Sequence, residues 1–266
     1  MADLAGYRVL LGSRLQSQLT YRGSFALDVV GNVGIGLLEF VEIYAIFHNV
    51  DALGGLGFSG ALLVFALANI CFSLADLAVG HVDELPTYLR AGTLDVLLLR
   101  PRSVLGQLVA GDVSLRRLGR TAVGLVLLAV ALPTAVPRWG VDTVVVVCLT
   151  PVFGAAIFAA LFVSVGAMQF WLGDGREFGN AFTYGGSYAA SYPASLLHVA
   201  LRSFFTFVVP AAFTAYLPAL LILDQPGPPY LPSWLGWCTP LAAGLAWVVA
   251  LLWWRRGLRH YTGAGG

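Results

Sequence analysis

The sequence predicts an all-α integral membrane protein with six transmembrane helices, an N-terminal helix at the membrane interface and short helices in the cytoplasm. Three observations lead to this fold class. Hydrophobic residues make up 58% of the 266 residues and charged residues only 11%, with a mean hydropathy of +0.81, whereas a soluble domain carries about 25% charged residues. The apolar residues gather in long runs. The arginines lie almost entirely on one side of those runs.

The composition also excludes several classes of protein. A soluble enzyme, a disordered chain and a nucleic-acid-binding protein would all carry more charge, and a net charge of +1 offers no attraction to a polyanion. All 15 basic residues are Arg, a bias typical of GC-rich genes, and we therefore take the origin to be bacterial. The chain is predicted to form a single domain over residues 1–266.

The first expected element covers residues 4–21. Leucine, valine and tyrosine side chains alternate there with Arg8, Arg14 and glutamines, so the segment is too polar to span a membrane. We interpret it as an amphipathic helix lying in the inner membrane interface. The alternative is a cytosolic helix packed against the spans.

Six stretches are apolar enough to be membrane helices, which need about 20 mostly apolar residues. They cover residues 27–47, 58–80, 121–136, 141–171, 199–222 and 235–254. The connections expected on the outside are short. The last of them, residues 224–233, is rich in proline and should be an irregular loop.

The distribution of arginine predicts the orientation, because cytoplasmic loops carry the excess of Lys and Arg. With the N-terminus inside, every arginine except Arg138 is cytoplasmic, including Arg202 at the inner start of the 199–222 span. We therefore predict a multi-pass protein of the bacterial cytoplasmic (inner) membrane, with both termini in the cytoplasm.

The cytoplasmic segment 81–107 is a long mixture of polar and apolar residues. A first short helix should end at Gly92, which can adopt a left-handed conformation. Thr93 can cap a second helix, with Asp95 in its first turn, and Pro101 stops that helix. The result would be two helices hinged at Gly92 with an exposed apolar surface suited to a soluble partner. The alternative is a segment that lies in the membrane interface.

Three passages carry a resemblance to a known family. The first, LRAGTLDVLLLRPRS, contains a G-x-[LF]-D-x-L-L-x-R-P run. The second is SYPASLLHVALRSFFTFVVPAAFTAYLPA, and the third is the ending GLRHYTGAGG, which departs from the family only at Gly263, where Ser is common. In this order on a six-span layout, they resemble the ABC-2 type transporter permeases, specifically a bacterial branch long described as uncharacterised. The resemblance covers essentially the whole chain.

The resemblance implies a transmembrane subunit of an ATP-driven ABC transporter. Its partners would be an ABC ATP-binding subunit, a second permease chain in a homo- or heterodimer, and membrane lipids, with no nucleic acid. Residues 4–21 would be the elbow helix and 81–107 the coupling region. The stretch with Asp174, Arg176 and Glu177 would be a second cytoplasmic contact. The residues expected to couple to the ATPase are Glu84, Leu85, Tyr88, Leu89, Arg90, Gly92, Leu94, Asp95, Leu97, Leu98, Arg100 and Pro101.

ATP hydrolysis is expected on a separate subunit. The chain contains no G-x-x-x-x-G-K-[ST] loop and no Lys with which to make one. We therefore expect that this chain is not an enzyme and binds no cofactor itself, with ATP and magnesium held by the partner.

Polar and kinked positions inside the spans are candidates for lining a transport path. Glu39 and Glu42 share one face of the first span, and a carboxylate in a bilayer by default faces the bundle interior or a water-filled path. The alternative places both near the outer interface. Pro210 and Pro218 should break the 199–222 span, with Tyr216 between them, giving a re-entrant outer gate or simply a bent helix.

The favoured function is export of a lipid-like or amphiphilic substrate, by family analogy. The main alternative is an ion- or proton-coupled carrier or channel that uses Glu39 and Glu42. Such a carrier should show internal repeats and charges paired across several spans, and the sequence shows neither.

Overall fold

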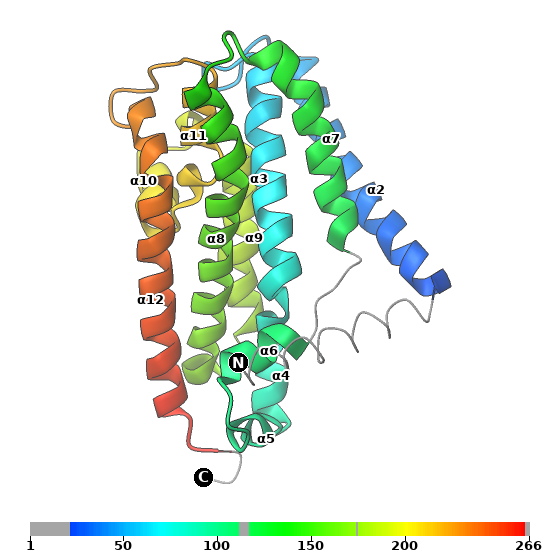
Figure 1. Ribbon diagram of the computed structural model, residues 1–266, viewed down its shortest axis with the longest axis vertical. Coiled ribbons are helices and arrows are strands. Elements are labelled where there is room, and N and C mark those ends of the chain that lie inside the picture. Colours follow the sequence, from blue (N-terminus) through cyan, green and yellow to red (C-terminus); the bar gives the residue numbers. More distant parts are fainter. Residues whose placement is uncertain (1–21, 112–116, 174, 264–266) are drawn as a thin grey trace.

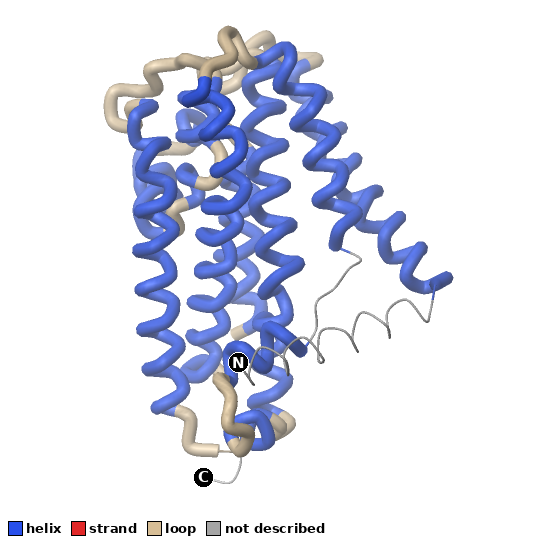
Figure 2. The backbone as a smooth tube through the Cα atoms, viewed as in Figure 1, coloured by secondary structure: helices blue, strands red, loops and turns tan. Residues whose placement is uncertain are grey.

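The structure is a computed structural model that describes residues 22–111, 117–173 and 175–263. Within these ranges the chain forms helices joined by turns and loops (Figures 1 and 2). This confirms the predicted all-α fold. The interfacial helix expected at 4–21 lies outside the described residues, as does Asp174.

Five long apolar helices correspond to five of the six predicted spans. α2 packs mainly on α7 and diverges from the bundle toward its N-terminal end, whereas α3, α8 and α12 run side by side (Figure 1). The agreement follows from the length and apolarity of these segments. Their bounds are α2 Arg22–Phe47, α3 Phe58–Val79, α7 Leu118–Ala135, α8 Val141–Leu172 and α12 Thr239–His260.

α3 lies at the centre of the bundle and is buried along most of its length. Glycines on its neighbours make close packing possible. A Cβ atom at Gly124 of α7 would lie 2.8 Å from Ile70, and one at Gly154 of α8 would lie 2.4 Å from the Cys71 sulfur. Small residues at such contacts let membrane helices approach closely.

The two ends of the bundle are distinct, and we name them by what they carry. The inner end carries α4 Leu85–Arg90, α5 Leu94–Leu98 and α6 Val104–Gly111. The outer end carries the loops 48–57, 136–140 and 223–232 (Figure 1). A 3₁₀ turn at Gly80–Glu84 joins α3 to α4.

The fifth crossing of the bundle is α9, Arg176–Ser191, and not the predicted 199–222. At the inner end, Arg176 forms an ion pair with Glu84. Just beyond the other end of α9, Ser195 donates a 2.7 Å hydrogen bond to the Gly54 carbonyl in an outer-end loop. Together with α2, α3, α7, α8 and α12, α9 brings the crossings among the described residues to six.

The segment 199–222 is re-entrant, which is one of the two forms that we predicted for its proline break, so our expectation that it crosses the bundle was wrong. Its two arms, Val199–Val208 and Ala211–Ile222, are bent by 70°. Arg202 in the first arm donates a 2.7 Å hydrogen bond to the Tyr230 hydroxyl in the outer-end Pro-rich loop. Arg202 therefore lies toward the outer end, contrary to its predicted inner position.

Proline chemistry explains the break. Pro210 follows a π-helical turn, Phe204–Val208, and has no N–H with which to continue it. The turn packs against α9, where a Cβ at Gly186 would lie 3.2 Å from Val209. Irregular backbone at membrane depth is tolerated where other parts of the protein cover it.

A labelling experiment tests this topology. In a variant with its three native cysteines replaced, we expect a membrane-impermeant thiol reagent to label His198→Cys and Gln225→Cys from the same side of the membrane. Ala91→Cys should be labelled from the opposite side, because α4 ends at the inner end. Labelling of His198→Cys together with Ala91→Cys would show that α9 does not cross.

Candidate coupling site and charged contacts

The first part of the coupling region, as far as Arg90, continues the helical turns of α3. Helical turns continue from Phe58 to Arg90 over 33 residues, which is about 50 Å at the rise of an α-helix. Because the hydrocarbon core of a bilayer is about 30 Å thick, the residues after Val79 project beyond it. Gly92 has φ +66° and reverses the chain, as predicted. Thr93 does not cap α5, and its hydroxyl instead contacts the Tyr88 carbonyl at 3.5 Å.

Only part of the predicted docking surface is exposed. Leu85 and Leu94 are fully buried in the core of the chain itself, and Leu97 is partly buried against that core. The expectation that Leu85 and Leu94 offer an apolar surface was therefore wrong. The exposed apolar side chains of this segment, which we call the coupling tip, are Val96, Leu98 and Leu99, exposed by 52%, 47% and 87%.

Charged and special residues border the coupling tip. Arg90 and Gly92 lie at one margin, and Arg100 and Pro101 at the other; Gly92 is partly buried and the other three are exposed. Tyr88 and Leu89 are partly buried under the tip. The structure thus brings the predicted coupling residues together in one region. Some of them are exposed, and the others are buried and anchor the segment in the core.

Gln107 stabilises the coupling tip through hydrogen bonds to the backbone on either side of its exposed residues. We did not predict this role from the sequence. The Gln107 Nε2 donates to the carbonyls of Leu97 at 2.9 Å and Arg102 at 3.2 Å. The side chain is buried in α6, an otherwise apolar helix. A lone amide in an apolar helix was the available signal, because a buried amide needs hydrogen-bond partners.

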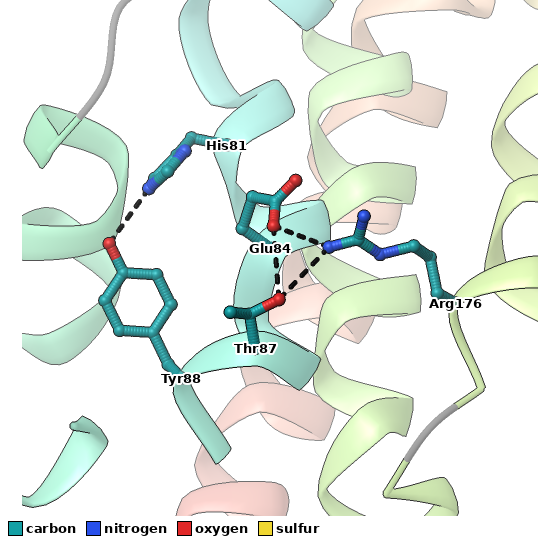
Figure 3. A network of polar contacts seen from close by, with 5 residues as sticks. All are labelled: His81, Glu84, Thr87, Tyr88 and Arg176. Atoms are coloured by element: carbon teal, nitrogen blue, oxygen red, sulfur yellow. Dashed lines mark hydrogen bonds and ion pairs between the residues drawn. The ribbon is translucent and has the colours of Figure 1, made fainter. Parts of the chain in front are cut away.

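A polar network ties the coupling region to the start of α9 (Figure 3). Arg176 forms a 2.5 Å ion pair with Glu84 and donates to the Thr87 hydroxyl at 3.3 Å. Thr87 in turn donates to Glu84 at 3.3 Å, and His81 is 3.1 Å from the Tyr88 hydroxyl. Since Glu84 and Arg176 are more than one-third exposed, we expect this pair to contribute little stability. It joins the two inner-end segments that the resemblance implicated.

The end of the chain reaches the coupling region as well. A Cβ at Gly263, where φ is +91°, would lie 3.9 Å from both carboxylate oxygens of Asp95. Partial burial and the Asp95 carboxylate raise the pKa of the Tyr261 hydroxyl. The Tyr261 ring also packs on Phe170 of α8, with 6.2 Å between ring centroids. Two of the three passages that carry the resemblance therefore meet in space.

A polar cavity of about 490 Å³ lies beside this network at the inner end. Its wall includes Asp83 and Arg117, and Arg117 forms a 2.9 Å ion pair with Asp76 at the end of α3. Burial and, to a smaller extent, the Asp76 carboxylate raise the pKa of Asp83 to about 7, against the opposing effects of Arg117 and Arg176. Asp83 is thus a carboxyl group that changes charge near neutral pH.

Glu39 is paired inside the bundle. Its carboxylate accepts from Arg120 of α7 at 2.5 Å and from Asn69 of α3 at 3.0 Å. The Arg120 guanidinium also lies 5.0 Å from the centre of the Phe72 ring, a favourable cation–π geometry. Glu39 is about 12 Å of helix from Phe47, the outer end of α2. Arg120 compensates its charge, and its depth relative to the outer interface stays a prediction.

The remaining candidates for a transport path are spread along the outer half of the bundle. Glu42 is exposed and accepts a 2.8 Å hydrogen bond from the Tyr192 hydroxyl. Tyr216 and Pro218 are buried at the start of α11, Tyr216–Ile222. Pro210 lies at the re-entrant turn and lines an apolar pocket. The structure does not gather these residues around one cavity with Glu39. That they line a transport path remains a prediction.

The fold and the site define a helical membrane bundle with an anchored apolar tip at its inner end. A family model described as ABC-2 family transporter protein matches residues 33–265. The chain belongs to this family, whose members pair with an ABC ATP-binding subunit. No curated protein and no solved structure matches the chain.

We expect the Glu39–Arg120 pair to be a main source of stability in the α2–α7 arm. Glu39→Gln should leave the buried guanidinium uncompensated and cost about 3 kcal/mol, lowering the melting temperature in detergent by roughly 10 °C. The double change Glu39→Gln with Arg120→Gln should recover part of this loss. Glu42→Gln, at an exposed carboxylate, is the matched control and should change the melting temperature little. Additive losses in the double variant would contradict the pairing.

Asp83 should make stability depend on pH. Its pKa in the folded chain is raised to about 7 from an ordinary value of 3.8. Its contribution to folding is therefore fully present below the ordinary value and is lost as the pH rises through about 7. Melting temperatures of the wild type should fall over this window relative to Asp83→Asn. Parallel curves for the two proteins would contradict the assignment.

Proposed function

We propose that this chain is the permease subunit of an ATP-driven exporter and that it receives the work of ATP binding through the coupling tip. The single observation that carries the proposal is the contrast within α4–α5. Leu85 and Leu94 anchor the segment in the core, while Val96, Leu98 and Leu99 stand exposed beside them. Aliphatic side chains exposed at the polar end of a membrane bundle suit contact with another protein.

The proposed partner is an ABC ATP-binding subunit that holds ATP and magnesium. Its movement on binding ATP would push the coupling tip. Because the tip continues into α3 through α4 and the Gly80–Glu84 turn, the push would reach the centre of the bundle. The bundle would then change between inward- and outward-open arrangements, a two-state equilibrium that ATP binding biases.

Charge supports placing the inner end in the cytoplasm. Arginines are concentrated at the inner end, whereas Arg138 and Arg202 lie toward the outer end, in keeping with the positive-inside rule. We propose a bacterial inner membrane and cytoplasmic termini. The inner-end arginines within the described residues are Arg90, Arg100, Arg102, Arg117, Arg176, Arg255, Arg256 and Arg259.

A second permease chain would complete the transporter. α2 exposes apolar side chains such as Leu27, Leu38 and Tyr44 and contacts few other elements, which leaves a broad apolar face for a neighbouring permease or for lipid. A lipid-like or amphiphilic substrate and the export direction rest on family analogy. The alternative, an ion-coupled carrier, keeps one of its predicted features, because Glu39 and Arg120 form a charge pair between α2 and α7.

Charging the coupling tip tests the proposal. We expect Leu98→Asp with Leu99→Asp to lower co-purification of the ATPase and transport at least tenfold, since truncating a central contact at an interface costs about 2 kcal/mol or more. Leu196→Asp, at an exposed leucine of the outer end, is the control and should leave both unchanged. Retention of a stoichiometric, stimulated ATPase by the double variant would overturn the docking assignment.

A further inference from the structure

An apolar pocket opens on the side of the bundle between α8, the re-entrant segment and α12. Its volume is about 300 Å³, roughly ten times the share of liquid volume that one water molecule occupies. Along α12 it extends from Cys238 to Val249, about 16 Å at the rise of an α-helix. Its other walls are formed by Ile157, Ala160, Leu161, Ser164, Thr206, Phe207, Val208, Pro210 and Phe213.

One polar atom in the wall of this pocket lacks a partner. The Thr206 side chain is 1% exposed, and its hydroxyl makes no hydrogen bond within the described structure. By contrast, the Ser164 hydroxyl in the same wall donates to the Ala160 carbonyl of its own helix at 2.8 Å. A buried hydroxyl without a partner carries a desolvation cost, and a ligand acceptor that met the Thr206 hydroxyl after the side chain turned toward the pocket would remove that cost.

The absence of charge among the side chains that line the pocket indicates the class of ligand. None of the side chains that line the pocket carries a formal charge, so nothing there would hold a charged headgroup. A trapped water molecule usually makes about three hydrogen bonds, and this wall offers few polar atoms. The pocket therefore suits a hydrocarbon chain with a single hydrogen-bond acceptor.

The location of the pocket indicates that this ligand comes from the bilayer. Its rim includes Phe207, Leu241 and Leu245, which are exposed by 65%, 63% and 59%. These side chains belong to membrane-embedded segments, so the rim faces the acyl chains of the bilayer. We propose that the pocket binds one acyl chain of a membrane phospholipid, with a carbonyl oxygen of the lipid accepting a hydrogen bond from Thr206. The site goes beyond the proposed transport function, because it does not require that the bound lipid be carried across the membrane.

The site would place the lipid against the bend of the re-entrant segment. Its wall includes the π-helical turn and Pro210, the point at which the re-entrant segment changes direction. An acyl chain seated there would pack against both the turn and α12 and so stabilise the turn in this conformation.

Photocrosslinking in nanodiscs tests the proposal directly. The probe is a phosphatidylethanolamine with a photoactivatable diazirine on one acyl chain, applied to the full-length chain. Peptide mapping should place the crosslinks on the pocket wall, including the α12 stretch from Cys238 to Val249. Ala246→Phe, which fills the pocket, should lower this labelling at least tenfold. Val248→Phe, at an exposed position of α12 outside the pocket, should leave it unchanged.

The hydroxyl is tested separately. Thr206→Val keeps the shape of the side chain and removes the donor, so labelling should fall by roughly two- to tenfold, the range expected for one hydrogen bond. Thr206→Ser should restore it. Equal labelling of Ala246→Phe and Val248→Phe would overturn the proposal. So would crosslinks spread evenly over α2 and α12, or a pocket occupied by a helix of a second chain in crosslinked dimers.

Discussion

The burial of α3 is the constraint on which the rest of the structure depends. Of its most apolar stretch, 78% is buried inside the protein, with α7, α8 and α9 packed around it. Close contacts at Gly124 and Gly154 leave little room for α3 to move independently of its neighbours. Because the helical turns of α3 continue to Arg90 in the coupling region, we expect a force on the tip to be transmitted to the bundle.

Three ion pairs along the bundle connect elements that are distant in sequence. Glu84–Arg176 joins the coupling region to α9, Asp76–Arg117 joins α3 to α7, and Glu39–Arg120 joins α2 to α7. Exposure falls from the first pair, whose side chains are 43% and 35% exposed, to the last, at 14% and 17%. The energetic importance of the pairs should therefore increase with depth, because water screens the outermost pair and a membrane-buried charge without a partner is costly.

Much of this fold could be predicted from the sequence, because apolar length identifies membrane helices. The length of the apolar runs predicted five of the observed spans. The left-handed conformation that glycine can adopt predicted the turn at Gly92. The signal failed at α9, whose Arg, Glu, Asn and Ser residues make it too polar to recognise, although small residues such as Gly179 and Gly186 mark its packed face. It also assigned a crossing to 199–222, because apolar composition cannot distinguish a span from a re-entrant segment that the protein covers.

The candidate site was predictable only in outline. The sequence pattern placed an apolar surface at 94–99, but which leucines face the core depends on how the segment folds back on α3 and α6. Leu94 is buried and Leu99 is 87% exposed although both belong to one apolar run. The partners of Glu39, Asp83 and Gln107 come from other elements, and no local pattern in the sequence reports such tertiary contacts.

The most direct test of the central claim is photocrosslinking from Leu99 in the native membrane. With benzoylphenylalanine at position 99, the account predicts a crosslinked product that contains a Walker-motif ATPase, whereas the same group at Gln225 should yield none. A crosslink to the ATPase from position 225 and none from 99 would place the coupling surface at the wrong end of the molecule and contradict the account.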